Sequence, residues 1–248
     1  MKVIVPKAYA RVVLLGLLLA ALIAGAISAI PEGAQVSIGA RETRATQVPQ
    51  NVTADAGNVT NVNITSNQQT EAWQGFYGEV NGSIVLEDAS GDLFYSWNIT
   101  NVSGEVYASR DNAINFGVIF PNNNCSIDNG LTGFGRSDSG NNTYSPSTNR
   151  AVSVGNVLIN ASSSCATYTY VNDSPQSAFF HNIILTDDVN PNATGQPNAT
   201  VGGNTSVYVA LIENNIAGFD SATHDYQLLV PVNRTAGFNI YSFYAELG

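Results

Sequence analysis

The stretch that decides the fold is FYGEVNGSIVLEDASGDLFYSWN, residues 76–98, in which short apolar runs alternate with clusters of turn-forming residues. Within each run, apolar and polar side chains alternate with a period of two, which is typical of strands that bury one face. The segment DASGD, residues 88–92, separates two runs and predicts a turn. Asn81 begins an Asn-x-Ser sequon, so it has to stay in solvent if it carries a glycan.

The same pattern continues along the rest of the chain. Further strands are predicted at residues 105–109, 116–120, 151–159, 166–171, 178–186, 206–212, 226–230 and 240–247, with a long polar region at 122–148. In the last strand, Tyr241, Phe243, Ala245 and Leu247 are expected to face the core, and Ser242, Tyr244 and Glu246 to face solvent. No stretch after residue 31 has a convincing helical period. We therefore predict an all-β domain over residues 73–248, an antiparallel β-sandwich that is Ig-like or jelly-roll-like.

Residues 1–29 form a targeting segment. Lys2, Lys7 and Arg11 precede an uncharged run from Val12 to Ile30, which ends in small residues before Pro31. This order is typical of a cleaved secretory signal peptide. Two other interpretations stay open, namely a retained anchor helix that spans the membrane and a pilin-type signal whose helix would form a filament core. All three export the C-terminal part, so we predict an extracellular or cell-surface location.

The composition of the exported part excludes several partners. Only 11% of the residues are charged, whereas a cytosolic domain usually has about 25%. Beyond residue 29, six arginines oppose 19 acidic residues, so the net charge of that part is −13. Such a chain repels nucleic acid and anionic lipid head groups.

Asparagine sequons offer another way to keep the surface hydrated. Fourteen of the 29 asparagines stand in Asn-x-Ser/Thr sequons, about three times the number that the Ser and Thr content would produce by chance. The alternative is that turns rich in Asn and Thr generate sequons without function. Asn172 is the weakest candidate, because Pro175 follows its Ser174. The predicted N-glycosylation sites are Asn51, Asn58, Asn63, Asn81, Asn98, Asn101, Asn124, Asn141, Asn160, Asn192, Asn198, Asn204 and Asn233.

The two cysteines, Cys125 and Cys165, fit an exported protein. In an oxidising compartment we predict that they form a disulfide, which would close a loop of about 40 residues. The alternative is two reduced, buried thiols.

The extension between the signal and the domain, residues 30–72, is polar and has no aromatic residue. In AQVSIGA, residues 34–40, the side chains of Ala34, Val36, Ile38 and Ala40 fall on one face of an extended segment. This pattern predicts a donor strand that adds to a groove of another subunit. A strand that completes its own sheet is an equal alternative. The segment NVTNVNIT, residues 58–65, has the same ambiguity.

Patterns that would indicate catalysis are weak. The segments SDSG at 137–140 and SATHD at 221–225 are similar to fragments of chymotrypsin-like proteases, but they occur in reversed order. His181 is more consistent with a structural histidine than with a base. The acidic clusters at 87–92, 187–190 and 220–225 are the places where Ca²⁺ would bind, although none has EF-hand spacing. We expect no enzyme activity, no catalytic residue, no cofactor and no metal site.

From WQGFYGEVNGSIVLEDASGDLFYSWN through YVALIENNIAGFDSATHDYQLLVP to YSFYAELG, the chain resembles secreted surface β-proteins of archaea, over roughly residues 50–248. It is loosely similar to exported archaeal β-sandwich proteins that polymerise into surface filaments by donor-strand exchange. The resemblance implies a structural role at the cell surface. A glycosylated subunit of a homopolymer is therefore the leading hypothesis. The alternative is an adhesin module that binds carbohydrate or another surface, with Tyr144, Tyr168 and Tyr170 as an exposed platform.

Overall fold

The computed structural model describes residues 30–99, 101–146, 150–155, 157–159, 164–171, 174–175, 179–187 and 205–248. These residues form a predominantly β chain of antiparallel sheets, as predicted, with two one-turn helices and a 3₁₀ turn. The predicted signal or anchor, residues 1–29, lies outside this part. Within it, no helix has the length and apolar character needed to cross a bilayer.

The elements have the following bounds. They are β1 (Glu32–Gly33), β2 (Trp73–Gly78), β3 (Ser83–Glu87), β4 (Leu93–Asn98), β5 (Gly104–Ser109), η1 (Phe116–Val118), β6 (Ile119–Pro121), α2 (Asn129–Thr132), α3 (Gly140–Thr143), β7 (Ser145–Pro146), β8 (Val152–Val154), β9 (Val157–Ile159), β10 (Cys165–Tyr168), β11 (Tyr170–Val171), β12 (Ser174–Pro175), β13 (His181–Asp187), β14 (Thr205–Leu211), β15 (Ile216–Ala217), β16 (Thr223–His224), β17 (Tyr226–Pro231) and β18 (Ser242–Leu247).

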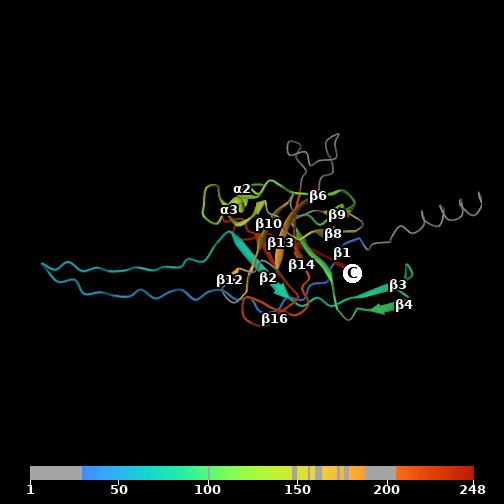
Figure 1. Ribbon diagram of the computed structural model, residues 1–248, viewed down its shortest axis with the longest axis horizontal. Coiled ribbons are helices and arrows are strands. Elements are labelled where there is room, and N and C mark those ends of the chain that lie inside the picture. Colours follow the sequence, from blue (N-terminus) through green and yellow to red (C-terminus); the bar gives the residue numbers. More distant parts are fainter. Residues whose placement is uncertain are drawn as a thin grey trace, which may run out of the picture.

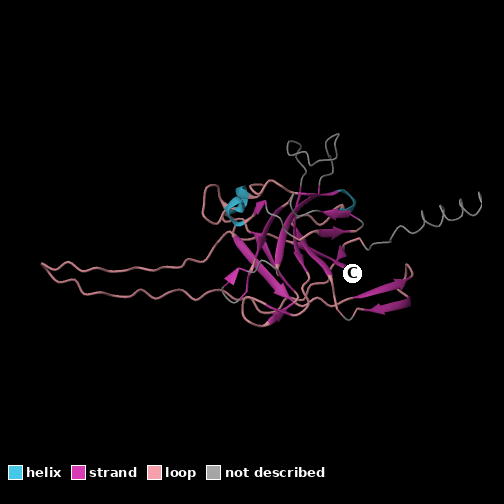
Figure 2. Cartoon of the chain, in the orientation of Figure 1, coloured by secondary structure: helices cyan, strands magenta, loops and turns pink. Residues whose placement is uncertain are grey.

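One eight-stranded sheet organises the body of the molecule. Its strand order is β1-β18-β5-β14-β13-β10-β7, and β6 pairs with the second half of β13. Strands β2 and β17 form a second sheet, and β3–β4 and β8–β9 form separate hairpins. Figures 1 and 2 show these sheets stacked in a compact body, from which β3–β4 and a long loop project.

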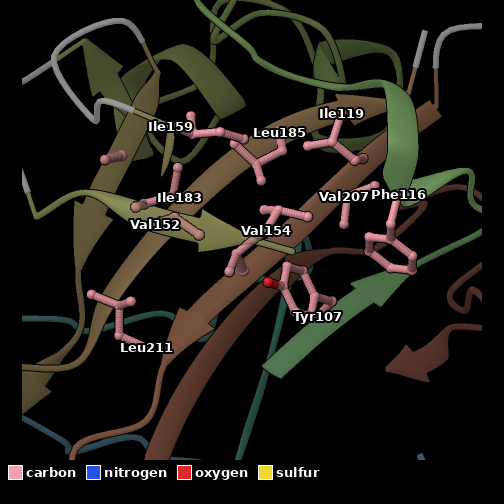
Figure 3. Packing of buried hydrophobic residues seen from close by; sticks show 12 residues of the cluster. Tyr107, Phe116, Ile119, Val152, Val154, Ile159, Ile183, Leu185, Val207 and Leu211 are labelled. Carbon is pink, nitrogen blue, oxygen red and sulfur yellow. The ribbon is translucent and has the colours of Figure 1, made fainter. Parts of the chain in front are cut away.

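Both faces of the central sheet are buried, because successive residues of its strands enter two different clusters. On one face, Tyr107, Ile183 and Val207 pack beneath Val152 of β8 and Phe116 of η1. Figure 3 shows these side chains converging from the sheet and from its cover. Antiparallel sheets more often leave one face in water. Here the double cover explains why β13 and β14 are buried along almost their whole length.

The opposite face of the central sheet is covered by β2 and β17. Ile184 and Tyr208 of the sheet join Leu228 and Val230 of β17 in the second cluster, and Phe76 of β2 packs at its edge. The ring of Phe76 meets that of Phe243 on β18 edge to face, with 5.1 Å between the ring centroids. The β2–β17 sheet therefore packs against this face of the central sheet.

The disulfide predicted between Cys125 and Cys165 is present, with a Cα–Cα distance of 5.4 Å. It joins the segment that carries α2 and α3 to β10. The backbone N–H of Cys165 also donates to the carbonyl of Asn122 at 2.6 Å. Tyr144, at the end of this segment, is buried against the sheet and donates its hydroxyl to the Leu229 carbonyl at 2.9 Å.

Three details differ from the sequence-based expectations. Residues 116–120 begin as a 3₁₀ turn, because the Asn115 side chain accepts a hydrogen bond from the Gly117 N–H. Residues 151–159 form a hairpin instead of one strand. On β18, Tyr244 and Glu246 do not face solvent, since Tyr244 packs on the first cluster and Glu246 is buried.

Candidate assembly site

The extension forms a long arm, residues 35–69, that projects from the body. Figure 1 shows two legs that run out together and return to the body at β2. A turn in which the Asn58 N–H donates to the Asp55 carbonyl lies between the legs. Nearer the body, the Arg44 guanidinium donates to the Asn67 carbonyl and so links the legs. Every residue of the arm is exposed.

The predicted donor residues lie where the outgoing leg leaves the body. Glu32 and Gly33 pair with β18, and the Ala34 N–H donates to the Phe243 carbonyl at 3.0 Å. The start of the extension is thus a short edge strand of its own sheet. Beyond it, Val36 is 57% exposed and Ile38 is 88% exposed, and Ala40 is exposed as well. The apolar face predicted from the sequence is therefore not buried in the same chain.

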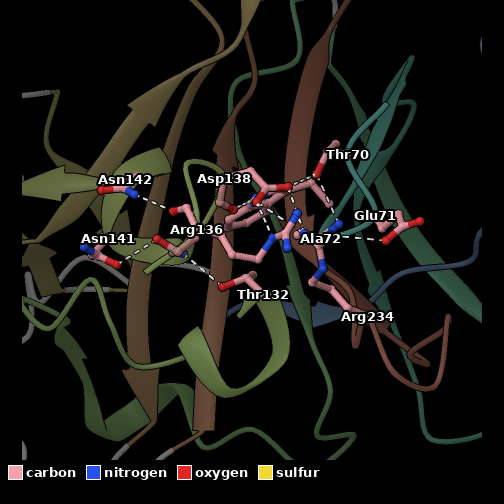
Figure 4. A network of polar contacts seen from close by, with 12 residues as sticks. Thr70, Glu71, Ala72, Thr132, Arg136, Asp138, Asn141, Asn142 and Arg234 are labelled. Carbon is pink, nitrogen blue, oxygen red and sulfur yellow. Dashed lines mark hydrogen bonds and ion pairs between the residues drawn. The ribbon is translucent and has the colours of Figure 1, made fainter. Parts of the chain in front are cut away.

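The return leg is fixed to the body by a polar cluster around Asp138, which Figure 4 shows. The Asp138 carboxylate accepts hydrogen bonds from the Thr70 hydroxyl at 2.8 Å and from the Arg234 guanidinium at 3.0 Å. Arg234 also pairs with Glu71 at 3.2 Å, and the Trp73 indole N–H donates to the Asp138 carbonyl at 2.7 Å. Partial burial opposes ionisation of Asp138, but Thr70 and Arg234 outweigh it and lower the pKa of this carboxyl. We call these residues the arm clamp.

A small cavity of about 130 Å³ lies at one edge of the body, beside β2 and the loop that leads into β18. Phe76, Val230 and Tyr241 supply apolar walls, and Arg41 of the outgoing leg lines it as well. Phe238, on its rim, is 68% exposed. Among the described strands β2 pairs only with β17, so its other edge has no strand partner there, although the Gly75 carbonyl accepts from the Gln74 side chain at 2.6 Å. The lining includes Gln74 of β2 and its cross-strand partner Val230 of β17, so the cavity lies over one face of this two-stranded sheet and has both polar and apolar walls. A strand added at the edge of β2 could place side chains near it.

The described glycosylation candidates lie at the surface, with one partial exception. Asn51, Asn58, Asn63, Asn81, Asn98, Asn101, Asn124 and Asn141 are exposed, and Asn233 is half-buried. The other candidates, Asn160, Asn192, Asn198 and Asn204, lie outside the described residues, as does Asn172. Three of the exposed sites are on the outer part of the arm. No asparagine precedes Asn51, so the donor segment itself carries no sequon.

Two buried glutamates were not expected from the sequence. Glu105 on β5 and Glu246 on β18 are directly paired across the sheet, and both lie beneath the β8–β9 hairpin. Glu105 accepts from the Ser153 N–H at 3.2 Å, and Glu246 accepts from the Gly155 N–H at 2.9 Å. Burial raises the pKa of Glu105 to about 7, and the charge of Glu246 acts in the same direction. Both carboxyl groups thus accept hydrogen bonds from the backbone of the β8–β9 hairpin that covers them.

The segments that are similar to protease fragments do not come together. His224 contacts the Asp220 carboxylate at 2.9 Å on β16, whereas Ser139 precedes α3 and donates to Asn141. Figure 1 places α3 and β16 at opposite ends of the body. His181 is fully buried and stacks on Tyr168, and burial lowers its pKa to about 4. It is therefore neutral at pH 7, and neither of its buried ring nitrogens has a hydrogen-bond partner among the described residues.

The acidic clusters serve mainly as hydrogen-bond acceptors for the backbone. Asp88 accepts from the N–H groups of Ser90 and Asp92 within its own turn, and buried Asp225 accepts from those of Val80 and Asn215. Asp188 and Asn190 lie outside the described residues. In the part of the chain that is described, no three His, Cys, Asp or Glu side chains gather into a metal-binding group.

The aromatic platform proposed for an adhesin does not form. Tyr144 is only 1% exposed and Tyr168 is stacked on His181, so Tyr170 alone of the three is well exposed. Three other exposed aromatic residues lie close together on β4, where Phe94 is 84% exposed, Tyr95 53% and Trp97 49%. The sequence predicted β4 as a strand but not the exposure of its side chains.

Comparison with known proteins adds no relative from which a function could be transferred: no family model, no curated protein and no solved structure matches this chain.

Proposed function

We propose that this protein is a non-enzymatic, N-glycosylated structural subunit of an extracellular assembly, in which the outgoing leg of one arm docks in the groove beside β2 of the next subunit. The protein would be an exported β-sandwich of the Ig-like or jelly-roll-like kind. The observation that carries the proposal is the arm itself. Its apolar side chains are exposed in the isolated chain, which costs free energy unless a partner covers them.

The chemistry of the two surfaces supports this pairing. The donor segment offers small and β-branched side chains at every second position, and beyond Ala34, whose N–H donates to Phe243, it belongs to none of the described strands. The cavity offers Phe76, Val230 and Tyr241 as apolar walls, and the nearby strand β2 has one edge without a partner among the described strands. Backbone hydrogen bonds would supply affinity, and the pockets would select side-chain size. Because donor and acceptor are different surfaces, the contact is head-to-tail and continues into a filament instead of closing.

Sequon placement fits the same arrangement. The donor segment has no sequon, so a glycan would not block its insertion. The exposed sequons elsewhere would hydrate the surface of the assembly. Intact-mass measurement of the native protein should give several glycan increments above the polypeptide mass. The bare polypeptide mass would refute glycosylation.

The assembly proposal is tested with Val36→Asp/Ile38→Asp in the full chain, produced in its own host. Charges in the groove should abolish filaments in electron micrographs of the cell surface. The matched control is Val59→Asp/Ile64→Asp, which adds the same charge to the return leg and keeps both sequons. We expect the control to assemble.

Two results would contradict the proposal that the donor segment inserts into a neighbouring subunit. Normal filaments from Val36→Asp/Ile38→Asp would show that this segment does not insert into a neighbour. Loss of the β-sheet signal in circular dichroism would show that the segment stabilises its own domain instead.

A further inference from the structure

Two Asn-Gly dipeptides occur in the chain, at residues 81–82 and 129–130. In such a dipeptide the backbone nitrogen of glycine can attack the side-chain amide of asparagine, because glycine has no Cβ to shield its nitrogen and its backbone bends easily. The reaction is intramolecular, so its rate depends on whether the local structure lets the two groups meet. The fold places the two dipeptides in opposite environments.

The first dipeptide lies in the loop that joins β2 to β3, where Asn81 and Gly82 are both exposed. Within the described part of the chain, neither the Asn81 side chain nor the Gly82 N–H takes part in a hydrogen bond. The Asn81 side chain can therefore rotate until its Cγ reaches the Gly82 nitrogen, and no other contact has to be broken first.

The second dipeptide is held in place. Asn129 is only 5% exposed, and its Nδ2 donates to Oδ1 of Asn141 at 2.8 Å. Its backbone begins α2, where its carbonyl accepts from the Gly133 N–H at 2.8 Å. Attack on this side chain would require the Asn141 contact to break and α2 to open locally. Asn129 therefore serves as an internal control for Asn81.

The accessible dipeptide is also the one that belongs to a sequon. Ser83 completes the sequon of Asn81, whereas Leu131 stands at the corresponding position after Asn129. We propose that Asn81 is a site of succinimide formation and that a glycan on its Nδ2 protects it. A glycan is bulky, so it would crowd the approach of Gly82 and turn the small leaving group into a large one. The protection rests on the glycosylation in the proposed function, but the reactivity of Asn81 does not.

The chemical steps need no reactant except water. The Gly82 nitrogen forms a bond to Cγ of Asn81, and the bond from Cγ to Nδ2 breaks. The leaving nitrogen departs as ammonia, with the proton that the Gly82 nitrogen gives up. Water then opens the cyclic imide at one of its two carbonyls, which yields aspartate or isoaspartate. In isoaspartate the main chain is one methylene longer.

A longer main chain at residue 81 would disturb contacts on both sides of the loop. Before it, the Val80 N–H donates to the buried Asp225 carboxylate at 2.8 Å. After it, Gly82 lies so close to Leu247 that an added Cβ would be 2.2 Å from Leu247 Cδ1. A larger residue at position 82 would slow the reaction, but Leu247 would have to move. A glycan on Asn81 protects the loop without that change.

The test compares the wild type with Ser83→Ala, which removes the sequon and keeps Asn81 and Gly82. Both full chains are purified from their own host and incubated at pH 8, and peptide mapping by mass spectrometry follows asparagine, aspartate and isoaspartate at positions 81 and 129. In Ser83→Ala we expect Asn81 to be lost at least about tenfold faster than Asn129 in the same molecules, since Asn129 reacts only after local opening. Glycosylated Asn81 of the wild type should persist.

The matched control is Ser83→Thr, which changes the same exposed position but keeps the sequon, and it should behave like the wild type. Equal loss of Asn81 and Asn129 from Ser83→Ala would refute the reactivity of Asn81. Equal loss of Asn81 from the wild type and from Ser83→Ala would refute protection by the glycan. Rapid loss of Asn81 from Ser83→Ala alone would support the inference even on cells without filaments, because missing filaments contradict only the head-to-tail assembly.

Discussion

The body and the arm contain the same kind of side chain in opposite environments. Val207 and Val209 on β14 are completely buried, whereas Val59 and Ile64 on the arm are almost completely exposed. In both places β-branched residues alternate along an extended backbone. The difference lies in the neighbours, since β14 has β5 and β13 beside it and the arm has no strand partner among the described residues. Aliphatic content therefore indicates what a segment can pack against, and the partner decides whether it is buried.

The largest difference in stability is expected between two Ile→Asp substitutions, one in the body and one on the arm. Ile184→Asp places a carboxylate in the second cluster, where Ile184 is only 1% exposed. This should cost more than about 5 kcal/mol and unfold the body. Ile64→Asp on the arm should change stability by less than about 0.5 kcal/mol. Urea unfolding followed by circular dichroism measures both, and a comparable loss from Ile64→Asp would show that the arm packs on the body.

The disulfide should have the next largest effect. Cys125→Ser/Cys165→Ser opens a loop of 40 residues, which should lower the free energy of unfolding by about 3–4 kcal/mol. The body should still fold, because β5, β14 and β17 lie outside the loop. The free energies of the variant and of the oxidised protein are compared by urea titration. Finding both thiols free in native protein, by non-reducing peptide mapping, would contradict the prediction.

The buried glutamate pair predicts a pH dependence that belongs to the body. The pKa of Glu105 rises from 4.5 to about 7 on folding, so the folded state favours the protonated form. Its contribution is complete below pH 4.5 and is lost as the pH rises through 7, by up to about 3 kcal/mol. Glu105→Gln should therefore raise stability at pH 8 by about 1–3 kcal/mol and leave it nearly unchanged at pH 4. Unfolding free energies at both pH values provide the measurement, and equal effects of the variant at pH 4 and pH 8 would exclude the mechanism.

The smallest effect is expected at the boundary between the two regions. Asp138→Asn weakens the ion pair of the arm clamp but leaves the packing of the clamp unchanged. The free energy of unfolding of the body should therefore fall by no more than about 1 kcal/mol, with a correspondingly small decrease in melting temperature. Trypsin should cut the wild type first at Arg41 and Arg44, which are exposed on the arm. The cut protein should melt like the intact one in calorimetry. A large drop after cleavage would mean that the arm contributes to the core.

Much of the fold could be predicted from local patterns. The alternating runs located β2 to β5, β10, β14, β17 and β18 within a few residues, because turn residues bound each of them closely. The double cover of the sheet could not be predicted in the same way. HNIILTD of β13 has only three consecutive apolar residues, 183–185, between polar ones that are buried as well, and this sequence does not tell which strands lie above and below it.

Of the candidate assembly site, only the donor segment could be predicted from the sequence, and the groove could not. The period of two in residues 34–40 indicated an extended apolar face, and this needed no tertiary information. The groove requires Phe76, Val230 and Tyr241 to meet, and only strand pairing brings these distant residues together. Glu105 and Glu246 are likewise 141 positions apart. Two glutamates inside predicted strands were the only available signal, since Glu is depleted in strands.

The unequal attachment of the two legs has a mechanical consequence. The outgoing leg is held by β1, which is two residues long, whereas the return leg continues into β2, which pairs with β17 over six residues. A tensile load applied to the arm would peel β1 from β18 first, one backbone bond after another. The sheets beyond β2 would stay folded while the detached segment extended. A subunit joined to its neighbour through this arm would thus extend under strain before it ruptured.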